Sequence, residues 1–379
     1  MADRELRTHL RGGAAVTPRA MRGVLALVVL IGGMSLAFGI PRHPIESWSI
    51  YLVNFLFWSG LSAAGVAFAA LLELTDARWA RSIRPIAQRF AFFLPVSLLL
   101  FLLLLAGVRV LFPWATQPPA SHSGWFTVPA LAARDAVALL LLMFASFWFV
   151  RRSAAAHGNA SASMASVTPA AVSVLIVYAA SFSILAVDLV MSMQPGWTST
   201  LFPAYVFTGS LYGAIAAVSV AAAAHPDSAA GMPRDPATAR DLGKLLLGFS
   251  LLWLYLYWAQ FLTIWYGNVP REFEFLTSRM RGGWNAAAWI VFTLTFAAPF
   301  VLLLARRGRQ PRPVAIAALL CLTGIWLERL VLVAGGHSFD LAAVWIGVSV
   351  TAAFAALFVL SQIFAPAPAE RTEEYQRPR

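Results

Sequence analysis

The chain has 379 residues, of which 60% are hydrophobic and only 12% are charged. Soluble domains contain about 45–50% apolar and about 25% charged residues, so this chain has too little polar surface to cover a water-soluble globule. The composition also excludes a disordered chain, a collagen and a disulfide scaffold. Its apolar residues come in runs of about 20, the length that crosses a hydrocarbon core of roughly 30 Å. The sequence therefore predicts an all-α integral membrane protein.

Ten apolar runs, bounded by charges, prolines or glycines, predict ten membrane-spanning helices. The expected helices are Gly23–Ile40, Ile50–Leu72, Phe90–Phe112, Leu131–Val150, Pro169–Met191, Leu201–Ala224, Leu245–Trp265, Trp284–Leu304, Val314–Val333 and Leu341–Phe364. Residues 1–22 then form an N-terminal segment, residues 23–364 one membrane domain, and residues 365–379 a polar tail. The first run could instead be a signal peptide cleaved after Ser35-Leu36-Ala37, but its leader and apolar run are both long for one, so we expect a retained helix.

The basic residues predict the orientation of the chain. Of the 28 lysines and arginines, 21 fall in the N-terminal segment, the even-numbered turns and the tail. Because cytoplasmic loops carry the excess of basic residues, both termini are expected to be cytoplasmic. The net charge of +11 does not indicate a nucleic-acid partner, since the basic residues are scattered over short loops beside the spans. Membrane lipid is the expected partner of this charge.

Few residues of this chain could hold a redox cofactor. Cys321 is the only cysteine, so the chain alone can build neither an iron–sulfur cluster nor an internal disulfide. No apolar run contains a histidine, so a bis-histidine haem inside the membrane is not expected; the histidines are His9, His43, His122, His157, His225 and His337. We expect no metal site in this chain, and any haem or iron–sulfur cluster in partner subunits.

Charged side chains inside spans are costly, which makes each one a candidate functional residue. Asp188 lies about five residues from the outer end of the fifth helix, and Glu328 and Arg329 lie at a similar depth in the ninth. Neighbouring residues of a helix point about 100° apart, so we expect Glu328 and Arg329 to find partners on other helices, with Asp188–Arg329 as the first candidate pair. Gln260 lies at the same level of the seventh helix. A purely structural role for these groups is the alternative.

Other polar residues near the outer ends have simpler expected roles. Arg109, Arg134 and Asp135 are close enough to the interface to reach it with their side chains. Asn54 is expected to hydrogen-bond a neighbouring helix. The aromatic and charged segment from Trp265 to Trp284 predicts either an amphipathic segment on the membrane or a docking surface for a partner protein. A sharp turn is expected at Pro195-Gly196.

Residues 188–200, DLVMSMQPGWTST, resemble the Asp-x-x-Met-Ser-x-x-x-x-Trp-x-Ser-Thr signature of the large membrane subunits of alternative complex III. The resemblance continues through residues 202–207, 251–255 and 260–270, and includes the arginine-rich turn at 78–89. It covers nearly the whole chain. It is closest to the ActF-type subunit, a relative of the NrfD-like membrane anchors of polysulfide and nitrite reductases.

The resemblance implies a ten-helix subunit with two four-helix bundles, helices two to five and six to nine, plus peripheral helices. It implies a subunit of a quinol:cytochrome c oxidoreductase in a bacterial plasma membrane, with a multihaem cytochrome, an iron–sulfur protein and a second NrfD-like subunit as partners. Quinol would be the substrate, and haem and iron–sulfur clusters would be held by those partners. On this basis Asp188 and Glu328 are expected to transfer protons, and the expected quinol-lining residues are Gln260, Arg329, Trp197 and Tyr205.

Three departures from the family pattern keep other functions open. Gln194, Gly196 and Arg271 stand where the pattern has a carboxylate, a histidine and an acid. A redox-silent subunit of the same complex, which conducts protons or acts as a scaffold, is therefore an alternative. A secondary transporter is a third possibility, but it would need broken helices at the bilayer midplane, whereas the polar groups here lie off-centre.

Overall fold

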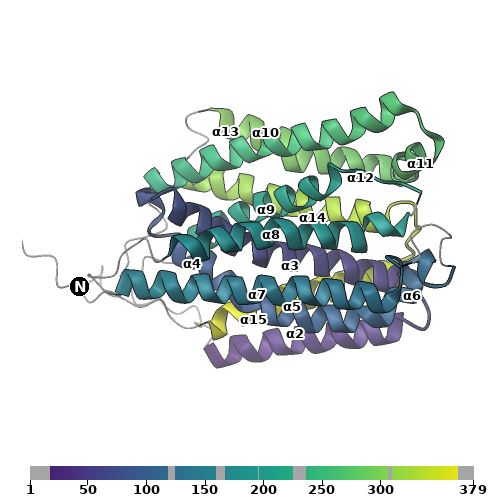
Figure 1. Ribbon diagram of the computed structural model, residues 1–379, viewed down its shortest axis with the longest axis horizontal. Coiled ribbons are helices and arrows are strands. Elements are labelled where there is room, and N and C mark those ends of the chain that lie inside the picture. Colours follow the sequence, from purple (N-terminus) through teal and green to yellow (C-terminus); the bar gives the residue numbers. More distant parts are fainter. Residues whose placement is uncertain are drawn as a thin grey trace, which may run out of the picture.

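The computed structural model describes residues 18–117, 124–158, 167–194, 196–224, 236–305 and 310–365 (Figure 1). Within these ranges the chain forms helices and no strands, and ten helices are long and apolar enough to cross a membrane. The prediction of an all-α, multi-pass membrane protein is confirmed. The segment before Pro18, the tail after Ala365 and the turn at Pro195 were also predicted, but lie outside the described residues.

The ten spans are built from helices of different lengths. The first three spans are α2 (Pro18–Gly39), α3 (Pro44–Leu74) and a composite of α4 (Arg84–Arg89), α5 (Leu94–Leu104) and α6 (Val108–Leu111). The next four are α7 (Val128–Gly158), α8 (Thr168–Leu189), α9 (Phe202–Ala224) and α10 (Pro236–Gly267). After the short helix α11 (Pro270–Ser278), the last three are α12 with α13 (Gly283–Phe292 and Ala298–Leu304), α14 (Pro311–Ala334) and α15 (Leu341–Phe364).

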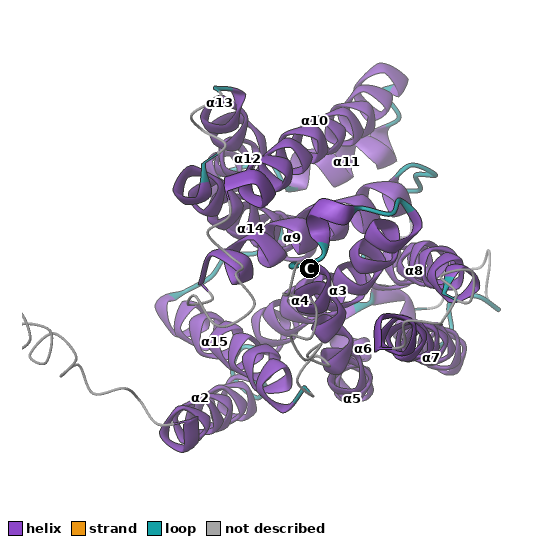
Figure 2. Ribbon diagram, turned by 90° about the vertical axis from the view of Figure 1, so that its left-hand side faces the viewer, coloured by secondary structure: helices purple, strands orange, loops and turns teal. Residues whose placement is uncertain are grey.

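The spans pack as two bundles with a peripheral pair, as Figure 2 shows in a view along the helices. Bundle one consists of α3, α5, α7 and α8, each in contact with the next, and α8 returns to contact α3. Bundle two consists of α9, α10, α13 and α14 in the same cyclic arrangement. Helices α2 and α15 pack on each other, and α15 covers α3. This arrangement agrees with the bundles that the family resemblance implies.

Helix α3 is the common core of the molecule, because it contacts α8, α9, α14 and α15. Its middle is rich in small residues, which allow neighbouring helices to approach closely in a membrane. A methyl group on Gly60 would lie only 2.7 Å from the Ser210 hydroxyl of α9, and one on Gly65 would collide with the Phe90 ring. Below, the amino end of the body is the end where α2 begins, and the far end is the opposite one, where α11 lies (Figure 1).

Candidate functional site

A buried ion pair lies in bundle two, near the far end of α14. Arg329 Nη1 donates to Glu328 Oε1 at 2.6 Å, and both side chains are almost completely buried. The expectation that these adjacent residues would find separate partners is therefore wrong. Their Cβ atoms do point in different directions, but both side chains are long enough to turn toward each other, and few other charges lie nearby to compete.

The backbone of α9 fixes the position of the guanidinium. Arg329 Nη2 donates to the Val206 carbonyl oxygen at 2.9 Å, and it lies 3.4 Å from the Ser210 hydroxyl. A methyl group at Gly209 would come within 3.1 Å of the same Nη2 atom. The missing side chain at this position leaves room for the arginine between α9 and α14.

Aromatic residues of α9 and α10 cover the carboxylate of the pair. Trp253 Nε1 donates to Glu328 Oε2 at 2.6 Å, and its indole stacks on Tyr257 with ring centres 5.0 Å apart. Tyr205 is buried beside them and its hydroxyl faces Glu328. Glu328 thus accepts hydrogen bonds from a cation and from an indole N–H, and hydrogen bonds to charged groups are the strong ones.

Two cavities meet beside this cluster at the far end. The first is a small slot of about 80 Å³, whose walls include Tyr205, Tyr257 and Gln260. The second, of about 480 Å³, is lined by Trp197, Ser199 and Gln260 among others. Gln260 and Ile264 belong to both linings, so the two cavities are adjacent. Together they are called the far-end pocket.

Gln260 contributes an unused hydrogen-bond donor to the far-end pocket. Its Oε1 accepts from the Ser199 hydroxyl at 2.9 Å, while its Nε2 is buried without a partner. The indole Nε1 of Trp197 is also buried without a partner. Buried donors are nearly always satisfied in proteins, so two unpaired N–H groups around one cavity indicate room for a ligand with acceptor oxygens.

Helix α11 closes the pocket from the far end, and it lies within the aromatic and charged segment from Trp265 to Trp284. Phe275 of this helix stacks on Trp197 with ring centres 3.6 Å apart. The Arg279 guanidinium lies over the Phe275 ring, with its Cζ atom 3.8 Å from the ring centre. Arg279 donates to the Leu332 and Phe275 carbonyls and to Gln194 Oε1. Burial lowers the pKa of Arg279 to about 9, which leaves it positively charged at neutral pH.

Asp188 belongs to bundle one, and its side chain lies on the face of α8 that points away from the far-end pocket. Its Oδ2 is 2.5 Å from Arg134 Nε, and its Oδ1 accepts from Trp125 Nε1 at 3.1 Å. The guanidinium of Arg134 also lies 3.8 Å from the centre of the Trp125 ring. The expected Asp188–Arg329 pair is therefore wrong, because α8 turns this carboxylate toward α7 and away from α14.

The neighbours of Asp188 were expected to reach the interface, and for Asp135 this is wrong. Asp135 is completely buried, its carboxyl interacts with that of Asp188, and neither of its oxygens has a hydrogen-bond donor. Arg134 is four-fifths buried by its contact with Asp188. Arg109 is exposed, as expected. Asn54 links helices as predicted, since it donates to Thr351 and accepts from Trp326.

The structure thus brings most of the predicted site residues together and separates one. Trp197, Tyr205 and Gln260 line the far-end pocket, and the Glu328–Arg329 pair lies behind it through Tyr205 and Trp253. Asp188 is on a different helix face, although its neighbours in sequence, Val187 and Met191, line the pocket.

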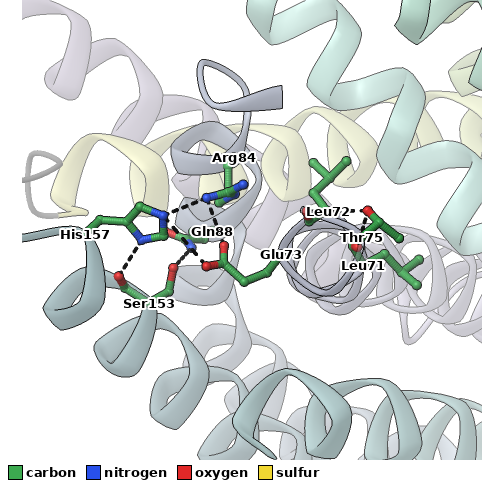
Figure 3. Close-up of polar contacts among 8 residues, drawn as sticks. All are labelled: Leu71, Leu72, Glu73, Thr75, Arg84, Gln88, Ser153 and His157. Atoms are coloured by element: carbon green, nitrogen blue, oxygen red, sulfur yellow. Dashed lines mark hydrogen bonds and ion pairs between the residues drawn. The ribbon is translucent and has the colours of Figure 1, made fainter. Parts of the chain in front are cut away.

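A polar cluster at the amino end of bundle one was missed by the sequence analysis (Figure 3). Arg84 Nη1 lies 3.0 Å from Glu73 Oε2 and 2.8 Å from His157 Nε2. His157 Nδ1 is 2.8 Å from the Ser153 carbonyl oxygen, so the ring contacts α4 through one nitrogen and its own helix through the other. The cluster ties α3, α4 and α7 together.

The signal for this cluster was the acid Glu73 at the end of an apolar run, beside the arginine-rich turn at 78–89. The predicted spans end at Leu72 and Val150, which places Glu73 and His157 in loops, whereas α3 and α7 continue to Leu74 and Gly158. Glu73 is then buried, and the partly exposed ring of His157 points toward Arg84.

A larger groove of about 790 Å³ opens beside α3 and α15. Its lining is mostly aromatic and aliphatic, including Trp58, Phe90 and Phe358, with Arg89 and Gln362 as its polar residues toward the amino end. It offers an apolar volume but no buried carboxylate, so substitutions in this groove serve as controls for ligand binding in the far-end pocket.

No model of a protein family matches this chain, and a search of curated proteins finds no match to its sequence.

Proposed function

We propose that this chain is a membrane subunit of a quinol:electron-acceptor oxidoreductase, and that it binds the quinol in the far-end pocket. The buried, unpaired Nε2 of Gln260 at the junction of the two cavities carries this proposal. A quinol or quinone has a flat ring, an apolar tail and two oxygens, so it needs an apolar slot with a few polar groups that fix its orientation. Tyr205 and Tyr257 supply aromatic walls for the slot, and Gln260 supplies a polar group that can orient an oxygen.

The chemistry of quinol oxidation assigns roles to the groups around the pocket. Oxidation of a quinol to a quinone releases two electrons and two protons. The electrons would pass to a haem or iron–sulfur partner subunit. Glu328, which faces Tyr205 beside the slot, is the proposed acceptor for one proton, and the second proton would pass to water at the open side of the pocket. Gln260 and Trp197 would orient the quinol oxygens, and Arg329 would keep the Glu328 carboxylate in place.

The proposed setting follows from the charge distribution and the family resemblance. The chain would lie in a bacterial plasma membrane with both termini cytoplasmic, so that the far end faces the periplasm. The proposed partners there are a multihaem cytochrome and an iron–sulfur protein, with a second NrfD-like subunit beside it in the membrane. Helix α11 with its exposed Phe273, and the exposed Tyr266 at the end of α10, would lie close to these partners.

One observation favours the redox-silent alternative. Gln194, which replaces a carboxylate of the family pattern, is occupied by Arg279 at 3.0 Å. A carboxylate that could take a proton is thereby replaced by a structural contact. In this alternative the chain belongs to the same complex and conducts protons, but no quinol enters the pocket.

Purification from native membranes tests the proposal. A tagged chain should copurify with a haem-containing and an iron–sulfur protein, and the complex should oxidise quinol. Gln260→Leu should lower turnover per assembled complex, whereas Gln362→Leu in the other groove should not. Copurification with unchanged turnover in Gln260→Leu would favour the redox-silent subunit. Isolation without any redox protein would contradict both and favour a transporter.

A further inference from the structure

We infer that Asp135 and Asp188 form a carboxyl pair that holds one shared proton inside bundle one. Asp135 was not expected to act, and it takes no part in the proposed quinol site. The inference concerns a proton-binding site of this chain alone, and therefore goes beyond the proposed function.

In the part of the chain that the structure describes, no hydrogen-bond donor contacts the Asp135 carboxyl group. Its side chain is completely buried, and both oxygens are shielded from solvent without a hydrogen-bond donor. An ionised carboxylate in such a place would lose its hydration and gain no hydrogen bond, which is among the most costly arrangements in a protein. A protonated carboxyl can instead donate to an acceptor, and the neighbouring acceptor is Asp188.

The charges of the cluster balance only if one of its two carboxyl groups is protonated. Among the described residues, the charged groups that act on Asp135 are Asp188 and Arg134. Two ionised carboxylates beside one arginine would leave one uncompensated negative charge in a buried site. One bound proton makes the cluster neutral, because the pair then carries a single negative charge opposite the guanidinium. Two carboxyl groups that cannot both ionise share a proton in the same way elsewhere.

Both oxygens of Asp188 already accept hydrogen bonds. Trp125 Nε1 binds one oxygen and Arg134 Nε binds the other. The Asp135 oxygens accept no such bond, so the proton is assigned mainly to Asp135. The resulting bond runs from the Asp135 hydroxyl to an Asp188 oxygen. The site lies between α7 and α8, behind the far-end pocket, since Val187 of α8 and Met191 just after it line the pocket.

Infrared spectroscopy of the purified full-length chain tests this inference. With ¹³C-labelled aspartate, in a detergent without ester groups, the wild-type chain at neutral pH should show a C=O band of a protonated aspartic acid that shifts in D₂O. Asp135→Asn should lose the band. Asp188→Asn should lose it too, because Asp135 would then ionise as the partner of Arg134. Glu328→Gln is the matched control and should keep the band.

A stability measurement accompanies the spectra. Each single Asn variant keeps one carboxylate opposite Arg134, so both should fold with near wild-type yield, whereas the double variant leaves the guanidinium unpaired and should lose most of its folded yield. No protonated band in the wild type, or a band of full intensity in Asp135→Asn, would overturn the inference. The readout needs no quinone, so its failure is distinguishable from failure of the proposed function.

Discussion

At the scale of single residues, ion-pair partners decide which polar groups act together. The sequence located Asp188, Glu328 and Arg329 correctly as buried charges, because charges in long apolar runs are conspicuous. It assigned their partners wrongly. Which face of α8 carries Asp188 depends on how the bundles pack, and the flexibility of long side chains lets Glu328 and Arg329 pair although they are adjacent. Asp135 could not be recognised because its position near a helix end matched an interfacial residue equally well.

The placement of Arg329 predicts that replacing Gly209 by alanine lowers the stability of the protein. In Gly209→Ala, the new methyl group would lie 3.1 Å from Arg329 Nη2, so the guanidinium must move and its bond to the Val206 carbonyl should weaken. We expect a loss of about 1 kcal/mol in unfolding free energy, measured by thermal unfolding in detergent. Gly213→Ala on the same helix is the control, since its methyl group would meet Leu61 and Ile325 at the ordinary distances of 3.5 and 3.7 Å. Equal losses in both variants would contradict this placement of the arginine.

At the scale of elements, the run lengths predicted all ten spans but not their internal irregularities. The eighth span changes from α12 to a π-helical segment, Thr293–Ala297, before α13 begins. Such a segment disturbs the regular pairing of backbone groups, and the Tyr212 hydroxyl satisfies the Thr295 carbonyl oxygen at 2.9 Å. This irregularity depends on side chains from α9 and α14, so the local sequence of the eighth span does not reveal it.

The π-helical segment predicts that Gly324 cannot be enlarged. In Gly324→Ala, the new methyl group would lie 2.9 Å from the backbone nitrogen of Thr295, and rigid backbone cannot yield as a side chain can. We expect a destabilisation of about 1–3 kcal/mol. Gly248→Ala in α10 has no atom within 4 Å of the new methyl group and should be neutral or slightly stabilising. Thermal unfolding of both variants measures the difference, and a tolerated Gly324→Ala would show that α14 packs less closely on the segment.

At the scale of the whole molecule, bundle two packs against α3 of bundle one, and each bundle holds at least one buried carboxyl group toward the far end. The pairing of bundles followed from the family resemblance, whereas the far-end pocket did not, because its walls come from the α8–α9 connection, α9, α10, α11 and α14 together. The alternation of basic residues between the two ends remains the argument for orientation.

Reporter fusions test that orientation. Fusions at Arg151 and Arg312 should report a cytoplasmic location, and fusions at Gln194 and Glu274 a periplasmic one, because the basic turns stay on the cytoplasmic side. Activity of a cytoplasmic and a periplasmic reporter at each position gives the measurement. A reversed pattern at two neighbouring positions would place the far-end pocket on the cytoplasmic side.

Quinone affinity tests most directly whether the far-end pocket binds quinol or quinone. A short-chain quinone is titrated into the purified chain, and binding is followed by tryptophan fluorescence in wild type, Gln260→Leu and Gln362→Leu. Loss of one hydrogen bond, about 0.5–1.5 kcal/mol, should raise the dissociation constant of Gln260→Leu roughly two- to tenfold, while Gln362→Leu binds as wild type does. Unchanged affinity in Gln260→Leu, or weakened affinity only in Gln362→Leu, would contradict binding in the far-end pocket.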